Sequence, residues 1–390
     1  MNSTEFYCIL IHYDEIAIKL GNRNWFEKQL IQNIKKQVSD LKYSKIQRFA
    51  GRVFINHIDY SKKNIYLQKI KNVMGVSSVH LMLRLPASID LIKQKTIDTL
   101  DSFSESFNSF KVFTKRQNKS FNMTSPDINA TIGDLIRIKF NKIVSLKNPD
   151  LEFRIEIIDD FALIGFEKLK GYGGLPVGTG EKALSLISSG IDSPVASFKM
   201  LKRGVQLSYI HFHSAPATGQ ESIDNVKKII DRLSEFQSSR KLFLIPFLDV
   251  QKAIMSSAPN KYWVILFRRA MMKVSTIIAK NINAKVLVTG ENVGQVASQT
   301  LSNIHVISDA ADIPTLRPLI GYNKKDIINL AVDIDTYEIS ILPYEDCCGF
   351  FVPKNPETKA KIDIIKDCEN NIEVDLEKIY NEVANKALSL

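Results

Sequence analysis

The sequence predicts an α/β protein whose second half is a doubly wound parallel sheet, preceded by two small α+β units. Apolar runs in the second half alternate with helical patterns, as in βαβ units; these runs are residues 184–188, 205–212, 241–246 and 285–289. Before residue 170, strand and helix signals are closely mixed. A glycine-rich stretch at residues 171–180 separates the two regions and predicts a linker.

The first region contains two groups of elements. In the first group we predict a strand at 7–11, an amphipathic helix at 24–38 and a strand at 52–55. In the second we predict helices at 62–71 and 88–100 and strands at 111–114, 151–158 and 161–167. We therefore divide the chain into domains at 1–60, 61–170 and 183–390, with a linker at 171–182.

The composition is that of an ordinary soluble protein of two or three domains, with 390 residues, 45% hydrophobic and 24% charged. The net charge of +10 favours a polyanionic partner such as nucleic acid. The N-terminus lacks a basic signal-peptide region, and no apolar run reaches membrane-spanning length, so we expect a cytoplasmic protein without a membrane partner. The four cysteines lack zinc spacing, so we expect reduced thiols and no metal site.

A basic loop is predicted between residues 114 and 127. It contains Lys115, Arg116, Lys119 and Phe121 and has no acidic residue before its end. Basic side chains next to an aromatic ring suit RNA phosphates and an unstacked base. With Lys111 in the preceding strand, the three basic residues are our candidates for RNA binding; a solvated loop without a ligand is the alternative.

The stretch from residue 184 to Pro194 predicts a buried strand, a loop of small polar residues and a helix. Pro194 is expected at the first helical position with Ser193 or Asp192 as the cap, and Gly204 ends the helix. The free N–H groups and the helix dipole at such a junction attract an anion. The alternative is a serine-rich turn that binds nothing.

The loop lacks the Gly-Lys-Ser/Thr of the common phosphate-binding loop. It resembles instead the Ser-Gly-Gly-x-Asp-Ser loop of PP-loop ATP pyrophosphatases, which hold pyrophosphate and leave AMP on the substrate. Ser189 stands where that loop has its first glycine. If this position needs a positive φ, serine adds strain of roughly 1 kcal/mol or more.

Ligands of doubly wound sheets bind beyond the carboxyl ends of the strands. This rule brings three segments to one crevice: the loop at 188–193, residues 211–214 after the second strand, and residues 290–292 after the fourth.

Several motifs in order resemble the tRNA 4-thiouridine synthase family, the ATP-dependent tRNA sulfurtransferases that also serve thiamine biosynthesis. The resemblance covers nearly the whole chain and is carried by residues 12–19, 173–178, 290–300, 316–320 and 343–348. It implies a ferredoxin-like domain at 1–60, a THUMP RNA-binding domain at 61–170 and a PP-loop ATP pyrophosphatase domain at 183–390. The chain corresponds to the short form, without room for a C-terminal rhodanese domain.

The resemblance also implies an ATP site, with Mg²⁺ as a second cofactor. Its candidate residues are Leu186, Ile187, Ser188, Ser189, Gly190, Asp192, Ser193, His211, Phe212, Arg268, Gly290 and Gln299. Asp192 would orient the loop or help to hold Mg²⁺, with a plain helix cap as the rival role. Lys324 would stabilise phosphate charge, and Arg317 and Lys325 could share that work. The alternatives are core packing for Leu186 and Ile187 and a structural role for His211.

Cys348 aligns with the catalytic cysteine of the family, so we expect it to carry sulfur as a thiolate or persulfide. Cys347 is the expected resolving thiol and Cys368 the other candidate. The alternative is a pair of buried, unreactive thiols.

The function implied is ATP-dependent sulfur transfer to uridine-8 of tRNA through an adenylylated uridine, with a possible role in thiazole synthesis. The partners implied are tRNA, a cysteine desulfurase or another sulfur donor, and a second copy of the chain in a homodimer. Two alternatives stay open: a PP-loop tRNA-modifying enzyme with a non-sulfur nucleophile, and a tRNA-binding protein whose loop has decayed, suggested by Ser189.

Overall fold

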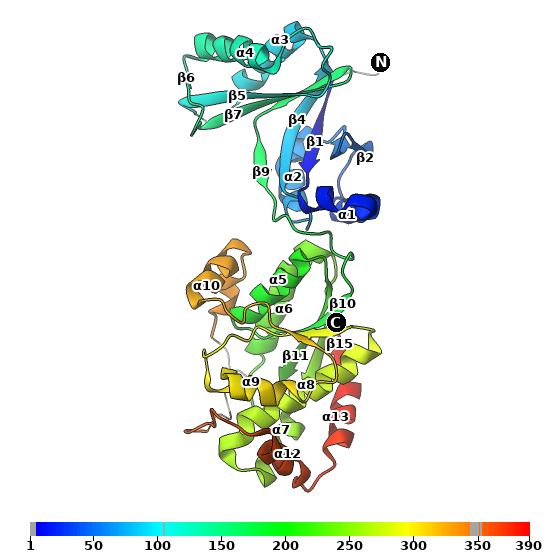
Figure 1. Ribbon diagram of the computed structural model, residues 1–390, viewed down its shortest axis with the longest axis vertical. Coiled ribbons are helices and arrows are strands. Elements are labelled where there is room, and N and C mark those ends of the chain that lie inside the picture. The colour runs from blue at the N-terminus through cyan, green and yellow to red at the C-terminus, as the bar shows by residue number, and fades with distance from the viewer. Residues whose placement is uncertain (1–4, 104–105, 344–350, 352) are drawn as a thin grey trace. The chain divides into compact units, whose positions relative to one another are not determined.

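The computed structural model describes residues 5–103, 106–343, 351 and 353–390. The chain forms two compact units, Met1–Gly174 and Leu175–Leu390, which are described separately (Figure 1). No helix in the described ranges combines the length and the apolar character needed to cross a membrane.

The N-terminal unit is built on one sheet, which among the described residues has nine strands in the order β2-β3-β1-β4-β8-β7-β5-β6, with β9 beside β4 (Figure 1). Its strands are β1 Phe6–His12, β2 Lys45–Phe49, β3 Arg52–Asn56, β4 Ser78–Pro86, β5 Ser109–Arg116, β6 Ile143–Val144, β7 Leu151–Ile158, β8 Phe161–Gly165 and β9 Lys168–Lys170. Its α-helices are α1 Arg23–Gln37, α2 Lys63–Lys71, α3 Ile89–Asp101 and α4 Ser125–Phe140. β5 runs parallel to β6 and β7, and the other pairs are antiparallel.

One face of this sheet is covered by two pairs of helices with separate cores. α1 and α2 pack on β1 and β3, whereas α3 and α4 pack on β5, β7 and β8. β4 serves both cores, because Leu81 belongs to the first and Leu83 and Leu85 to the second. Since α2 packs in the first core, the structure favours a boundary between the two N-terminal domains within β4. The sequence had predicted this boundary at residue 60.

The opposite face of the same sheet holds a buried ionic cluster. Glu156 of β7 is fully buried and lies 2.7 Å from Arg52 of β3 and 2.6 Å from Arg154. Strands β1, β4 and β8 lie between β3 and β7 in the sheet, so this contact shows that the sheet curls around its helix-free face. His12 lies 3.7 Å from the same carboxylate. Burial raises the pKa of Cys8, on the same face, to about 12, so this thiol is unreactive.

The C-terminal unit contains a sheet that in the described part of the chain has six strands in the order β14-β13-β10-β11-β12-β15. The strands are β10 Lys182–Leu186, β11 Gln206–His213, β12 Leu242–Pro246, β13 Val286–Val288, β14 Thr315–Leu316 and β15 Leu388–Ser389. All pairs are parallel except that of β12 with β15. The predicted fold class is confirmed, and the apolar runs of the sequence become the parallel strands.

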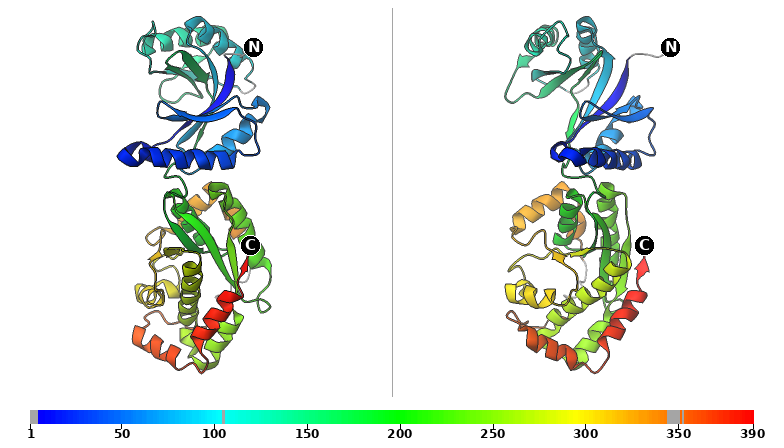
Figure 2. Two further views of the ribbon diagram at one scale, coloured as in Figure 1. Left: turned by 90° about the vertical axis from the view of Figure 1, so that its right-hand side faces the viewer. Right: turned by 45° about the vertical axis from the view of Figure 1, so that its right-hand side comes forward.

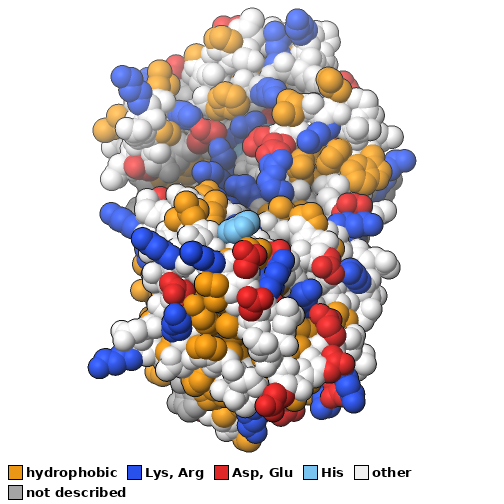
Figure 3. Space-filling view, turned by 60° about the horizontal axis from the view of Figure 1, so that its bottom comes forward, with side chains coloured by type: hydrophobic (Ala, Val, Ile, Leu, Met, Phe, Trp, Pro, Cys, Tyr) orange, Lys and Arg blue, Asp and Glu red, His pale blue; other side chains and the backbone are white. Residues whose placement is uncertain are grey.

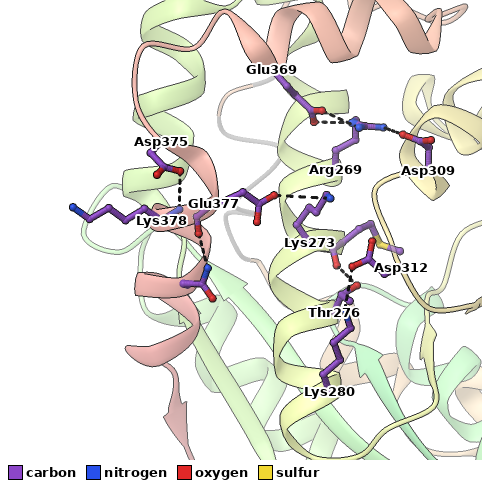
Figure 4. A network of polar contacts seen from close by, with 12 residues as sticks. Arg269, Lys273, Thr276, Lys280, Asp309, Asp312, Glu369, Asp375, Glu377 and Lys378 are labelled. Atoms are coloured by element: carbon purple, nitrogen blue, oxygen red, sulfur yellow. Dashed lines mark hydrogen bonds and ion pairs between the residues drawn. The ribbon is translucent and has the colours of Figure 1, made fainter.

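Helices cover both faces of this sheet (Figure 2). α5 Asp192–Lys202, α6 Glu221–Gln237, α10 Lys324–Asp333 and α11 Tyr337–Ser340 pack together in one layer. α7 Leu248–Ser257, α8 Trp263–Asn281, α9 Leu301–Ser308 and α13 Leu376–Asn385 form the other. The second layer is completed by α12 Ile362–Asn370, which an ion pair fixes to α8. Arg269 of α8 is 2% exposed and contacts Glu369 at 2.7 and 2.8 Å and Asp309 at 3.1 Å (Figure 4).

Two local predictions are wrong. α5 begins at Asp192, so Pro194 is its third residue, and neither Asp192 nor Ser193 makes a side-chain cap. β5 extends to Arg116, so Lys115 and Arg116 lie in a strand and not in the predicted loop. The strand continues because the backbone of Lys115 and Arg116 still pairs with β7. β2, β4 and α4 have no counterpart among the elements predicted from the sequence.

We predict that Glu156→Ala lowers the stability of the N-terminal unit by about 3–5 kcal/mol, because it leaves the buried guanidinium group of Arg52 without its carboxylate and removes the nearest carboxylate from the partly buried Arg154. Chemical denaturation of the full chain measures the change. The control is Asp40→Ala, because Asp40 pairs with Lys69 at 2.6 Å, away from the cluster, and its side chain is 62% exposed; this change should cost less than about 1 kcal/mol. Equal losses of stability in the two variants would show that the buried cluster contributes no more to folding than an exposed ion pair.

The buried histidines predict a pH dependence. Burial lowers the pKa of His12 to about 4 and that of His80 to about 2, despite the opposing effect of Glu156 on His12. A histidine with a depressed pKa in the folded state stabilises the protein above its unfolded pKa of about 6.5 and destabilises it as the pH falls from there. The N-terminal unit should therefore lose stability between about pH 6.5 and pH 4, and His12→Gln should flatten this loss. A stability profile that is already flat in the unchanged protein contradicts the prediction.

Candidate nucleotide-binding site

A pocket opens in the C-terminal unit at the carboxyl ends of β10, β11 and β13, as expected for ligands of parallel sheets. Its lining consists of Leu186, Ile187, Ser188, Asp192, Ser193, Ile210, His211, Phe212, Arg268, Met271, Met272, Thr289, Gly290, Glu291, Gln299 and Ile307.

The pocket brings together most of the residues predicted for nucleotide binding. Of these, Ser189 and Gly190 do not line it, although they belong to the same loop. The candidate residues for nucleotide binding do not include Ile210, Met271, Met272, Thr289, Glu291 and Ile307, although Glu291 belongs to the segment 290–292 that was predicted at the crevice. Helical spacing could have found two of them, because Met271 and Met272 follow Arg268 by three and four residues on α8. The binding roles themselves stay predictions.

The loop between β10 and α5, residues 187–191, is shaped by its own serines. The Ser188 N–H donates to Ser193 Oγ at 2.9 Å, and the two hydroxyl oxygens lie 3.1 Å apart. The φ angle of Ser189 is not positive, so the strain considered for a serine at this position does not arise. Ser189 is fully buried, and its hydroxyl lies 3.5 Å from that of Ser222 on α6.

His211 connects this loop to α6. Its Nδ1 lies 2.9 Å from the carbonyl oxygen of Ile187, and because a carbonyl only accepts, Nδ1 must carry the proton. Nε2 is then an acceptor for the Ser222 hydroxyl at 3.2 Å. With both ring nitrogens engaged and 3% of the residue exposed, the structure favours the structural role of His211.

Two arginines converge on one buried carboxylate in the pocket wall. Glu291 is 4% exposed and accepts from Arg268 at 2.7 Å and from Arg317 at 2.6 Å. Burial opposes the ionisation of Glu291, but the two guanidinium groups outweigh it and hold its pKa below the usual range. Arg317 also donates to Ser308 at 2.7 Å, which ties it to α9. The arrangement fixes Arg268 at the pocket wall and leaves an excess of positive charge there.

Asp192 at the start of α5 is held by two donors. Lys324, the first residue of α10, reaches Asp192 Oδ1 at 2.6 Å, and the amide of Gln295 reaches Oδ2 at 2.9 Å. Asp192 and Lys324, which were predicted for the site separately, are therefore in direct contact. Lys325 follows in α10 and is exposed.

Gly290 closes the pocket by a close backbone approach. A Cβ atom at this position would lie 2.8 Å from the backbone nitrogen of Ser193 and 2.9 Å from the carbonyl carbon of Asp192. No side chain fits there without moving the start of α5, so glycine is required by the contact itself.

The pocket suits ATP, and Asp192 is the lining carboxylate that could help to hold Mg²⁺. The apolar side chains of Leu186 and Phe212 suit a base, while Arg268 and the start of α5 suit phosphates. Asp192 accepts one hydrogen bond on each oxygen, from Lys324 and Gln295, which leaves lone pairs for an ion held mainly by nucleotide phosphates. Within the described residues, no group of three His, Cys, Asp or Glu side chains could hold a metal ion.

The candidate sulfur carriers Cys347 and Cys348 lie outside the described residues. Cys368 lies on α12, where burial, Asp367 and Glu369 raise the pKa of its thiol. A raised pKa lowers the thiolate fraction, which disfavours Cys368 as a resolving thiol.

The four candidate RNA-binding residues differ in their surroundings. Lys111 pairs with Glu152 at 2.7 Å. Arg116 donates to the carbonyl oxygens of Lys119 and Phe121 at 3.2 and 2.8 Å and so shapes the loop. The side chains of Lys115 and Lys119 are exposed. In Figure 3, basic side chains are seen on the visible face with acidic ones among them.

Comparison with known protein families identifies the domains. The family model described as "Thiamine biosynthesis protein (ThiI)" matches residues 178–374, the ThiI ferredoxin-like domain matches 8–79, and the THUMP domain matches 86–167. The chain belongs to the ThiI family. The resemblance drawn from the sequence motifs is thereby confirmed.

Curated ThiI relatives align over almost the full chain. A "Probable tRNA sulfurtransferase" of Brevibacillus brevis is 38% identical over 94% of this chain and 92% of its own length. One of Halothermothrix orenii is 37% identical over 97% of each chain.

Solved structures agree with this assignment. A 4-thiouridine synthetase in complex with RNA and bound ATP superimposes with a TM-score of 0.88 at 34% identity, covering 99% of each chain. PH1313 from Pyrococcus horikoshii shares the fold, with a TM-score of 0.63 at 22% identity over 85% of this chain and 100% of that one.

We predict that Gly290→Ala weakens ATP binding about tenfold, because the added methyl group overpacks the backbone at the start of α5. Isothermal titration with ATP measures the dissociation constant. Gly321→Ala is the matched control, since a Cβ there meets no atom within 4 Å. Equal ATP affinities of the two variants would mean that the close approach does not shape the nucleotide site.

Proposed function

We propose that this chain is an ATP-dependent tRNA sulfurtransferase that converts uridine-8 of tRNA to 4-thiouridine and releases AMP and pyrophosphate. The observation that carries the proposal is the pocket, in which Arg268, Gly290 and the start of α5 meet at the carboxyl ends of parallel strands. It is supported by the tRNA sulfurtransferase relatives and by the 4-thiouridine synthetase that was solved with RNA and ATP.

The chemistry must first improve a poor leaving group. The O4 atom of the uridine attacks the α-phosphorus of ATP, and the bond from that phosphorus to the bridging oxygen breaks, so that pyrophosphate leaves. A sulfur nucleophile then attacks C4 of the ring, and the C4–O4 bond breaks with AMP as the leaving group. The oxygen removed from the base therefore leaves within AMP.

The chain supplies charge stabilisation for the first step. Backbone N–H groups at the start of α5 and the hydroxyls of Ser188 and Ser193 hold the departing pyrophosphate. Arg268 and Lys324 add positive charge near the same phosphates. Asp192 orients the β10–α5 loop, and it would help to hold Mg²⁺ beside the phosphates if the ion accompanies ATP.

The sulfur step is assigned to Cys348 as a thiolate or a persulfide. If a persulfide delivers its outer sulfur to C4, the Cys347 thiolate can attack the Cys348 sulfur, release the thiolated base and form a disulfide. A persulfide donor such as a charged cysteine desulfurase would load Cys348 by transferring its outer sulfur, whereas free sulfide would displace AMP from C4 directly, without Cys348. A homodimer, a cytoplasmic location and a role in thiazole synthesis belong to the same proposal and rest on the family resemblance.

The alternatives make different predictions. A non-sulfur nucleophile would make Cys348 dispensable. A decayed tRNA-binding protein was suggested by the serine at position 189, but Ser189 does not adopt a positive φ, which removes the structural reason for that alternative.

We predict that the purified protein, incubated with a tRNA transcript, ATP and either sulfide or a cysteine desulfurase with cysteine, forms AMP and exchanges one oxygen for sulfur at uridine-8. Mass spectrometry of the tRNA and chromatography of the nucleotides measure the two products. With the cysteine desulfurase as the sulfur source, Cys348→Ser should form adenylylated tRNA without sulfur transfer, while Cys368→Ser, the matched control, should keep sulfur transfer. Unimpaired thiolation by Cys348→Ser would favour a different nucleophile, and the absence of AMP formation by the unchanged protein would exclude the proposed activity.

A further inference from the structure

The loop that joins β13 to α9, residues 289–300, has both ends in the wall of the nucleotide pocket. Gly290 and Glu291 line the pocket at its start, and Gln299 lines it at its end. Between them the chain runs out into solvent, where Gln295 is exposed. From this exposed position the Gln295 amide reaches Asp192 Oδ2 at 2.9 Å. The loop therefore contacts the start of α5 twice, through the backbone of Gly290 and the side chain of Gln295.

Gln295 completes the fixation of the Asp192 carboxylate. Lys324 holds Oδ1 at 2.6 Å, and a single donor leaves the carboxylate able to rotate about its Cβ–Cγ bond. Gln295 occupies the second oxygen and removes that rotation. Asp192 directly follows the β10–α5 loop, so the orientation of its carboxylate affects the positions of the backbone N–H groups that face the pocket.

Hydrogen bonds within the β13–α9 loop connect Gln295 to the pocket wall. The Gly294 N–H donates to the carbonyl oxygen of Gln299 at 2.9 Å, and the Gln299 N–H donates to that of Val296 at 2.8 Å. The Gln299 side chain in turn accepts from the Asn292 N–H at 3.3 Å. A displacement of Gln295 would therefore be passed to Gln299.

The residue type suits this position. Glutamine donates a hydrogen bond without charge, so it fixes Asp192 without adding a second cation beside Lys324. Glutamate would place like charges against each other, and alanine would leave Oδ2 without this donor.

We propose that Gln295 is a positioning residue for nucleotide binding, which acts through Asp192 to hold the β10–α5 loop and the β13–α9 loop in one arrangement. This inference rests on the proposed use of the pocket for ATP. It assigns Gln295 a role distinct from that of Lys324, because Gln295 orients the carboxylate and leaves the charge of the site unchanged.

The test is ATP binding by the full chain, measured by isothermal titration. Gln295→Ala should raise the dissociation constant roughly three- to tenfold, in line with the net contribution of one solvent-exposed hydrogen bond. Gln295→Glu, which keeps the length but turns the donor into a charged acceptor, should weaken binding at least as much. Gln206→Ala is the control, since Gln206 is an exposed glutamine in the same unit, and it should bind like the unchanged protein.

A double-mutant cycle tests whether Gln295 acts through Asp192. If it does, Gln295→Ala has little further effect once Asp192→Ala is present. In steady-state turnover, Gln295→Ala should raise the KM for ATP more than the KM for tRNA. The inference is overturned if Gln295→Ala or Gln295→Glu binds ATP like the unchanged protein, or if the two alanine effects add fully. If the unchanged protein binds no ATP, both the proposed function and the role of Gln295 are contradicted. If the unchanged protein binds ATP and thiolates tRNA, a failed result for the Gln295 variants contradicts only the role of Gln295.

Discussion

The nucleotide site depends on the close approach of the β13–α9 loop to the first turn of α5. Gly290 permits this approach because any Cβ would collide with the backbone of Ser193. The contact places the carboxyl end of β13 against the helix start that follows β10, so that Arg268, Glu291 and the β10–α5 loop face one pocket. Parallel strands alone would bring these segments to one edge of the sheet. The contact at Gly290 then determines how closely the β13–α9 loop packs against the start of α5.

Charge balance explains why the site favours an anion. Among the charged residues described at the pocket, Arg268, Arg317 and Lys324 are held by only two carboxylates, Glu291 and Asp192. The carboxylates orient the cations without cancelling them all, and a phosphate supplies the remaining negative charge. Holding the cations in place beforehand avoids reorganisation when the anion binds, which is the arrangement expected where charge develops during a reaction.

The sequence predicted the parallel sheet and most of the pocket, because apolar runs mark buried strands and the family motifs lie at their ends. It failed where tertiary contacts decide the structure. In β4 the apolar pattern is broken by His80 and Arg84, which the fold accommodates through burial of the imidazole and stacking of the guanidinium on Phe161 at 3.8 Å. Glu291 was placed at the crevice within the segment 290–292, but its pairing was not predicted, because a lone glutamate in a motif gives no sign of the two arginines that meet it, and Arg317 lies 26 residues away. The placement of Ser189 could not be predicted because it depends on the backbone of the loop and on Ser222 of a distant helix.

The central claim is that ATP activates the O4 atom of the target uridine by forming a bond to that oxygen. The most direct measurement uses tRNA that carries oxygen-18 at O4 of uridine-8, with mass spectrometry of the AMP formed during thiolation. The account predicts that the heavy oxygen is found in the phosphate of AMP, one atom for each sulfur introduced. AMP without the label, from tRNA that has been thiolated, would contradict it.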